Sequence, residues 1–365
     1  MKKKALLTLM IILLMSLLLF FPNLCLQSAQ TGLLLWFNKV LPSLLPFMIF
    51  INILMPLDGL KKLVAFSSPL SKRLWHLPGE SFFAFTTGLM AGYPMGAKVV
   101  KNLFSEQKLT KEEAERTLCF SNNCGPLFII GTVGTAMLSS TSIGYFLFLI
   151  HLLSAFIMSF LTTRNHTPYT HQKSEIPSSK TSLSFASILN QAVMNAMDTI
   201  VCVGGYIIFF SVIITLLTQT PFAITFINFV FPSSTFRSLF IGILSGFLEL
   251  SNGTHILSLM PSSVYVLALI SATLGFGGLC VYFQTLYVLE DSPLSTKTYF
   301  LSKSIQGIIS FSLTLILYPF YLLYTQGTSL MASYAILLQG SSFLCVSLIV
   351  GYFVFIPRTS LRHSI

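Results

Sequence analysis

Long apolar segments alternate with short polar ones along most of the chain. Many of the apolar segments approach or exceed the length of about 20 residues that a helix needs to cross a bilayer. Two polar interruptions stand out, a charged segment at 98–117 that predicts a surface helix and a loop rich in Ser, Thr and Pro at 162–184. The apolar segments fall near 5–21, 33–56, 82–97, 118–138, 142–161, 185–218, 236–253, 263–289, 300–324 and 330–356. This pattern predicts an all-α polytopic membrane protein.

Composition strengthens that prediction. Of the 365 residues, 54% are hydrophobic and only 9% are charged, whereas a soluble domain carries about 25% charged residues. The net charge of +10 does not indicate nucleic acid, because Lys and Arg lie mainly in short loops between apolar segments, where they determine topology. The six cysteines are scattered, and we interpret them as small apolar side chains. We therefore expect a protein of the lipid bilayer, without nucleic acid, cofactor or metal.

The basic residues also predict a topology with both termini in the cytoplasm. If segments 82–97 and 236–253 enter the bilayer and return on the same side, all but two of the 21 Lys and Arg residues are cytoplasmic. The two exceptions are Lys39 and Arg237, and Lys303 counts as cytoplasmic. If 82–97 crossed the bilayer instead, the basic residues that follow it would move outside. The positive-inside rule therefore favours two re-entrant hairpins.

These two hairpins resemble each other in sequence. The segments "PGESFFAFTTGLMAGY" (78–93) and "PSSTFRSLFIGILSGF" (232–247) align without gaps and share a Pro, a Phe and two Gly. Each is followed by a second polar and Gly-containing break, at 121–125 and at 271–275. Because an odd number of spans separates the hairpins, one hairpin would enter from each side of the membrane. The sequence thus predicts an inverted repeat with broken helices, an arrangement of many secondary transporters.

The repeat divides the chain into five expected parts. Each repeat would contain one hairpin followed by one broken helix. The parts are an N-terminal transmembrane helix (1–30), a first repeat (31–161, hairpin near 82–97, broken helix near 118–138), a cytoplasmic loop (162–184), a second repeat (185–325, hairpin near 236–253, broken helix near 263–289), and a C-terminal transmembrane helix with a tail (326–365).

The helix breaks are the places where a substrate could bind. Irregular backbone at membrane depth is tolerated only where it lines a cavity or is buried in protein, and the N–H groups at a half-helix N-terminus suit carboxylates. As alternatives, the glycines serve close helix packing, the Ser and Asn side chains cap helices, and the lysine lies at the membrane interface. The candidates for substrate binding are Gly92, Tyr93, Lys98, Ser121, Asn122, Asn123, Gly125, Ser251 and Asn252.

Two carboxylates lie inside apolar segments, Glu249 in the second hairpin and Asp198 in the segment 185–218. Intramembrane carboxylates are rare and usually functional, so we predict a coupling or gating role for both. The alternatives are a structural ion pair or a water-exposed hairpin tip for Glu249, and an interfacial helix start for Asp198. The sequence contains no P-loop, HExxH motif, dinucleotide fingerprint or recognisable nucleophile–base arrangement. We therefore expect no catalytic residues and no enzyme activity.

Three motifs carry a resemblance to a known family. "GLMAGYPMGAKVV", "SNNCGPLFIIGTVG" and "GFLELSNG" occur in this order, and with them the chain resembles sporulation integral membrane proteins of the YlbJ (SpoVV) type over residues 30–355. These proteins carry the nucleoside-recognition Gate region and are distantly similar to concentrative nucleoside transporters. By motif position, the resemblance implies a site at Gly92–Lys98, Ser121–Pro126 and Glu249–Gly253. Cys124 departs from the pattern, because Ser is expected there.

The resemblance implies a role in endospore formation. The protein would move dipicolinic acid from the mother cell across the outer forespore membrane, as a secondary transporter or facilitator. This small planar dianion would suit opposed half-helix N-termini. Two alternatives stay open, a cation-coupled nucleoside-type transporter and a non-transporting membrane scaffold that recruits sporulation proteins. An oligomer is compatible with the sequence.

Overall fold

The computed structural model describes residues 2–56, 59–164 and 184–326, and every regular element in these ranges is a helix. The helices of the first half are α1 (Lys2–Phe20), α2 (Pro22–Leu35), η1 (Trp36–Val40), α3 (Leu41–Leu54), α4 (Gly59–Trp75), α5 (Gly79–Ala91), α6 (Met95–Ser105), α7 (Lys111–Ser121), η2 (Leu127–Met137) and α8 (Thr141–Thr163). Those of the second half are α9 (Phe185–Thr218), α10 (Pro221–Val230), α11 (Ser234–Leu248), α12 (Leu250–Ser258), α13 (Val264–Phe276), α14 (Gly278–Val288) and α15 (Lys297–Gln326).

Five helical stretches in these ranges are long and apolar enough to cross a membrane. Many large apolar side chains on the helices face outward, for example Phe222 and Phe229 on α10, which are 78% and 84% exposed. Lipid can cover such a surface without cost, whereas water cannot. The candidate spans are Pro22–Leu54, Thr141–Thr163, Phe185–Thr218, Val264–Val288 and Lys297–Leu323. The prediction of an all-α polytopic membrane protein is confirmed.

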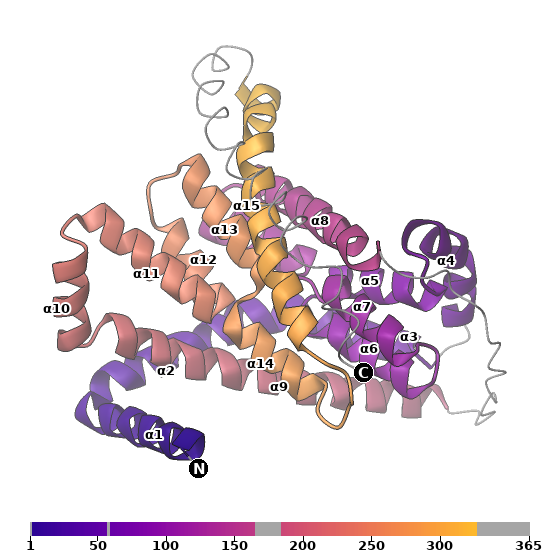
Figure 1. Cartoon of the computed structure of the whole chain (residues 1–365), viewed down its shortest axis with the longest axis horizontal. Coiled ribbons are helices and arrows are strands. Elements are labelled where there is room, and N and C mark those ends of the chain that lie inside the picture. The colour runs from indigo at the N-terminus through magenta and orange to yellow at the C-terminus, as the bar shows by residue number, and fades with distance from the viewer. Residues whose placement is uncertain (1, 57–58, 165–183, 327–365) are drawn as a thin grey trace.

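The same order of elements occurs twice along the chain. A long helix (α2–α3, then α9) is followed by a short one (α4, then α10), a hairpin (α5–α6, then α11–α12), a broken helix (α7–η2, then α13–α14) and a long helix (α8, then α15). Figure 1 places α4 and α10 at opposite ends of the molecule. This order supports the predicted inverted repeat, which stays a prediction.

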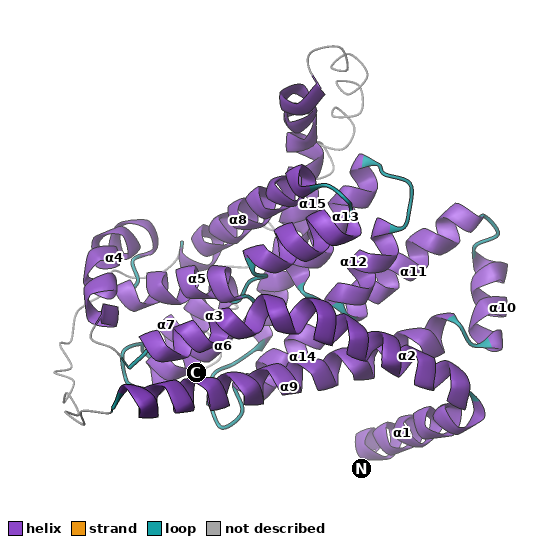
Figure 2. Cartoon of the chain, turned by 180° about the vertical axis from the view of Figure 1, so that it is seen from behind, coloured by secondary structure: helices purple, strands orange, loops and turns teal. Residues whose placement is uncertain are grey.

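Equivalent helices of the two halves pack against each other. The helices α2 and α3 lie along α9, as Figure 2 shows from behind, and α8 packs on α15. Two hydrogen bonds stabilise the packing of the first long helix on α9. Ser28 donates to the carbonyl of Ser211 at 2.8 Å, and Trp36 donates to the carbonyl of Ile200 at 3.1 Å. Paired long helices thus frame a centre that holds the hairpins and the broken helices.

Glycine allows hairpin α5–α6 to approach the end of α7. A Cβ atom on Gly88 would lie 1.7 Å from the carbonyl oxygen of Ser121, and one on Gly96 would lie 2.3 Å from the same atom. In hairpin α11–α12, by contrast, a Cβ on Gly253 would lie 2.1 Å from the Cα of Gly246 in the opposite arm. Glycine therefore allows close approach both between a hairpin and a neighbouring helix and between the two arms of one hairpin.

Several predicted boundaries differ from the structure. The segment 98–117 is not one surface helix, because it belongs to α6 and α7, whose apolar faces are buried. The segment 271–275 is helical, and the second broken helix is interrupted at Gly277, where a left-handed backbone with a φ of +88° ends α13. The first helix ends at Phe20 rather than near residue 30. The predicted C-terminal helix at 326–365 lies almost entirely outside the described residues, as does most of the loop 162–184.

Candidate functional site

Residues at or beside three of the four helix breaks line one central cavity of about 40 Å³, and two residues of α14, which begins after the fourth break, line it too. The hairpin α5–α6 turns at Gly92–Pro94, α7 and η2 are separated by residues 122–126 (the elbow), α11 and α12 are separated at Glu249, and α13 and α14 are separated at Gly277. The cavity is lined by Val40, Leu44, Tyr93, Cys124, Gly125, Phe128, Val203, Ile207, Glu249, Leu250, Ser251, Val281 and Gln284. Segments far apart in sequence therefore build a single site.

Glu249 is buried, with 2% of its surface exposed, and it caps α12. One carboxylate oxygen accepts the backbone N–H of Ser251 at 2.9 Å, and the other accepts the backbone N–H of Asn252 at 2.7 Å. The side-chain amide of Asn252 donates to Glu249 at 2.8 Å and to the hydroxyl of Ser211 on α9 at 2.8 Å. A carboxylate at a helix N-terminus is electrostatically favoured. Glu249 thus places a carboxyl group in the wall of the central cavity.

Gly92 and Gly125 let the first hairpin approach the elbow. Gly92 has a φ of +82°, a conformation that favours glycine, and a Cβ there would lie 3.0 Å from the nitrogen of Gly125 and 2.9 Å from Leu44. The two segments therefore pack backbone against backbone beside the central cavity. Any side chain at Gly92 would push them apart.

Asn122 is completely buried, and its amide bonds inside the protein. Its nitrogen donates to the hydroxyls of Thr285 at 3.0 Å and Tyr299 at 2.8 Å, while its oxygen accepts the backbone N–H of Ala97 at 3.4 Å. These contacts link the elbow to α14, α15 and α6. In this conformation the Asn122 side chain holds the elbow in place and does not line the cavity.

Asn123 is also completely buried. Its nitrogen donates to the carbonyl of Phe120 at 2.6 Å, and its oxygen accepts hydrogen bonds from Gln306 at 3.1 Å and from Lys303 at 3.2 Å. Ser121, one residue earlier than Asn122, is buried with no partner for its hydroxyl among the described residues. The Asn123 side chain therefore joins the elbow to Lys303 and Gln306 on α15.

The structure places a buried ammonium group beside the elbow. Lys303 on α15 is only 1% exposed, and its Nζ donates to the carbonyl of Asn122 at 2.8 Å and to the Gln306 side chain at 2.6 Å, besides Asn123. Lys303 forms no ion pair with any described residue. The topology count that placed Lys303 at the cytoplasmic surface is therefore corrected. The charge lies inside the protein.

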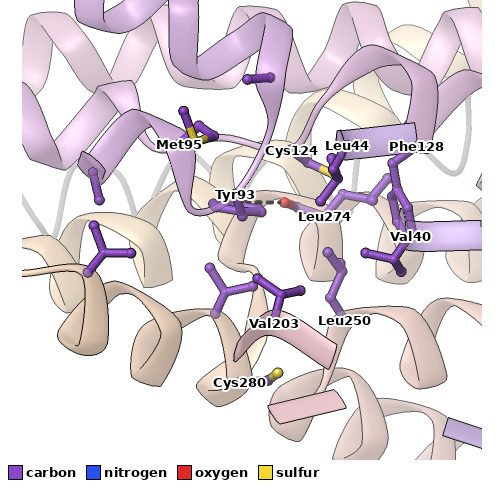
Figure 3. Close-up of a cluster of buried hydrophobic side chains, with 14 of the residues drawn as sticks. Val40, Leu44, Tyr93, Met95, Cys124, Phe128, Val203, Leu250, Leu274 and Cys280 are labelled. Carbon is purple, nitrogen blue, oxygen red and sulfur yellow. Dashed lines mark hydrogen bonds between the residues drawn. The ribbon is translucent and has the colours of Figure 1, made fainter. Parts of the chain in front are cut away.

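Tyr93 lines the central cavity and also contacts this ammonium. Nζ of Lys303 lies 5.1 Å from the centroid of the Tyr93 ring, within the range of a cation–π contact. The Tyr93 hydroxyl donates to the carbonyls of Leu274 at 3.3 Å and Gly275 at 3.4 Å, and Figure 3 shows the bond to Leu274 beside Cys124. Tyr93 thus links the cavity wall to the buried cation.

Lys98 and Asp198 lie away from the central cavity. Lys98 is half-buried, and its Nζ donates to the carbonyl of Asn195 at 2.9 Å and the hydroxyl of Thr199 at 2.7 Å. Asp198 is exposed on α9. Neither residue lines the cavity. Among the predicted site residues, the structure therefore brings Tyr93, Gly125, Glu249 and Ser251 together at the cavity, with the others around it.

Sequence reasoning missed the polar residues that later helices contribute. One signal was available, because Lys303 and Gln306 are spaced three residues apart within an otherwise apolar run and so share one helix face. No described group of three or more His, Cys, Asp and Glu residues is arranged to hold a metal. The missed residues are His151, which accepts the backbone N–H of Cys124 at 3.1 Å, and Gln284, Thr285, Tyr299, Lys303 and Gln306.

Comparison with known proteins gives one clear relative. The chain is 29% identical to the sporulation integral membrane protein YlbJ of Bacillus subtilis (strain 168) over 326 residues, which cover 82% of this chain and 79% of the relative. No protein-family profile and no solved structure matches the chain. The similarity confirms the resemblance to YlbJ-type proteins and supports a membrane role in sporulation.

Proposed function

We propose, from this similarity and from the central cavity, that the chain is a secondary transporter or facilitator of endospore formation. Its substrate would be dipicolinic acid, which it would move from the mother cell across the outer forespore membrane. The proposal treats the chain as a carrier and not as an enzyme. The observation that carries the proposal is that residues of three helix breaks line one cavity, with a buried ammonium that pairs with no described carboxylate close to the cavity residue Tyr93.

Helix breaks are costly inside a membrane. Each backbone group that loses its helical partner in hydrocarbon costs several kcal/mol unless protein or water replaces that partner. A chain that breaks helices only for shape would have little reason to gather the breaks at one place. Their position around a shared cavity supports a site where a polar solute crosses.

The charges around the cavity support an anionic substrate. Lys303 provides a positive charge that no described carboxylate neutralises, and its Nζ lies 5.1 Å from the ring of Tyr93, a residue that lines the cavity. Glu249 opposes an anion as long as its carboxylate is ionised and faces the cavity. We therefore propose Glu249 as the coupling or gating residue, which must be protonated or turn away before the substrate binds.

The size of the cavity supports a closed conformation. A volume of about 40 Å³ holds a few water molecules, whereas sites for drug-sized ligands measure roughly 300–1,000 Å³. A pyridine dicarboxylate would enter only after the hairpins move apart. The backbone contact between Gly92 and Gly125 is the place where such a separation would begin.

Two measurements test this function. Spores of a deletion strain should contain strongly reduced dipicolinate, and this chain should restore it. Vesicles that contain only this protein should then take up labelled dipicolinate. Normal spore dipicolinate in the deletion strain would overturn the proposal. Nucleoside uptake by the same vesicles would favour the nucleoside-type carrier, and transport of neither compound would favour the scaffold.

A further inference from the structure

The Lys303 ammonium sits in a site made of neutral oxygens. Its three acceptors are the backbone carbonyl of Asn122 at 2.8 Å, the Asn123 side-chain oxygen at 3.2 Å and the Gln306 side-chain oxygen at 2.6 Å. The Tyr93 ring covers the group at 5.1 Å. The three N–H donors of a lysine are thereby all satisfied without any carboxylate.

These oxygens resemble the ligands of an alkali-metal ion. Carbonyl and amide oxygens are ligands that suit hard cations, and Asn122 follows directly after the last residue of the half-helix α7. The C-terminal end of a half-helix carries negative partial charge, and such unwound ends hold coupling cations in transporters with broken helices. An ordinary lysine contact at a protein surface shares none of these features.

The acceptor oxygens are held in place by bonds that do not involve Lys303. The Asn123 amide is fixed by Phe120 at 2.6 Å and by Gln306 at 3.1 Å. The Asn122 amide is fixed by Thr285 and Tyr299 at 3.0 and 2.8 Å. The oxygens should therefore keep their positions when the lysine side chain is removed, which is the property of a preorganised site.

We propose that the Lys303 ammonium is a resident cation, which occupies at the elbow a site that would otherwise bind a monovalent metal ion such as Na⁺. It follows that the wild-type protein binds no Na⁺ at the elbow. Removal of the lysine side chain creates a Na⁺ site. This inference concerns cation binding at the elbow and does not depend on which substrate the protein moves.

The test compares thermal unfolding of the purified full-length protein in sodium chloride and in choline chloride at equal ionic strength. For wild type, we expect the same midpoint in both salts. For Lys303→Ala, we expect a lower midpoint in choline and a rise of about 2 °C or more in sodium.

Lys303→Met should show no sodium response, because the methionine side chain fills the space. Lys98→Ala, which removes another lysine that donates to a backbone carbonyl, is the matched control and should not respond either.

Two outcomes overturn the inference. One is a folded Lys303→Ala protein without any sodium response, which would make Lys303 a structural link between α15 and the elbow only. The other is binding of radiolabelled sodium to the wild-type protein that Asn123→Ala abolishes. This second measurement needs no lysine variant, so it decides the question even if Lys303→Ala fails to fold.

Discussion

The elbow of the first half and the hairpin break of the second half each place a charge at the end of a half-helix, but they obtain it differently. At the hairpin break, Glu249 caps α12 through N–H groups two and three residues away. At the elbow, the charge comes from Lys303, which is 181 residues from Asn122 in sequence. The acidic group is therefore held by its own hairpin, whereas the basic group comes from the distant helix α15.

This difference predicts how mutations divide between stability and transport. The contacts at the elbow tie α6, α7, α14 and α15 together, so damage there should first lower the stability of the fold. Glu249 bonds mainly within its own hairpin, so a change there should first alter function.

The largest effect should come from Gly88→Ala, which breaks the packing of the first hairpin against the end of α7. The new Cβ would lie 1.7 Å from the carbonyl oxygen of Ser121, so the backbone must shift. We expect a loss of about 3 kcal/mol in stability, measured as the yield and unfolding midpoint of purified protein. Gly205→Ala on α9 meets no atom within 4 Å and is the control, with an expected gain of about 0.5–1 kcal/mol. Equal behaviour of the two variants would contradict the packing described here.

Lys303→Met should lower stability by about 2 kcal/mol. It leaves the oxygens of Asn122, Asn123 and Gln306 without their charged donor in a buried place, and each such loss costs about 1–3 kcal/mol. Removal of a buried ammonium offsets part of this cost. The measurement is the midpoint of thermal unfolding in choline chloride. A variant as stable as wild type would show that the elbow does not depend on this charge.

Glu249→Gln should lower spore dipicolinate strongly while lowering the stability of the fold only slightly. The glutamine keeps the size of the side chain but loses the negative charge and one acceptor at the start of α12, a loss of about 1 kcal/mol. If Glu249 is the coupling or gating residue, spore dipicolinate should fall severalfold at equal protein level. Spores filled normally by this variant would rule that role out.

Glu113→Gln is the matched control for Glu249. Glu113 is also a buried glutamate, 4% exposed, that completes a capping box with Thr110 at the start of α7. It does not line the central cavity. The two variants should therefore lose similar stability, while only Glu249→Gln should lower dipicolinate.

The comparison also shows what could be predicted from sequence. The elbow and the turn at Gly92 were recognised because Gly, Pro and Asn inside an apolar run are local signals of a break. Glu249 was recognised because a carboxylate is rare in such a run. In each case, the residues that form the break or carry the charge are the same residues that indicate it in the sequence. The structure shows in addition what the side chain does, since Glu249 is the N-cap of α12.

Long-range features could not be predicted in the same way. Lys303 stands near the start of an apolar segment, where an interfacial lysine is the ordinary expectation, and its burial depends on how α15 crosses the elbow. The break within the second broken helix was placed at 271–275 because Ser, Thr and Gly occur there. These residues are compatible with a helix when neighbours pack closely, and the actual break follows from positive φ angles at Gly277 and Gly278.

The smallest effect should come from Lys98→Met, which removes a lysine that bonds to α9 and not to the elbow. Its two hydrogen bonds, to Asn195 and Thr199, lie at a half-buried position, so we expect a loss of at most about 1 kcal/mol. Uptake of labelled dipicolinate into vesicles should stay within about twofold of wild type at equal protein level, because Lys98 does not line the cavity. A large rise in KM without a change in unfolding midpoint would instead place Lys98 on the substrate path. In that case the positive charge that meets the anion would lie on the first hairpin, and the elbow would serve only to support the fold.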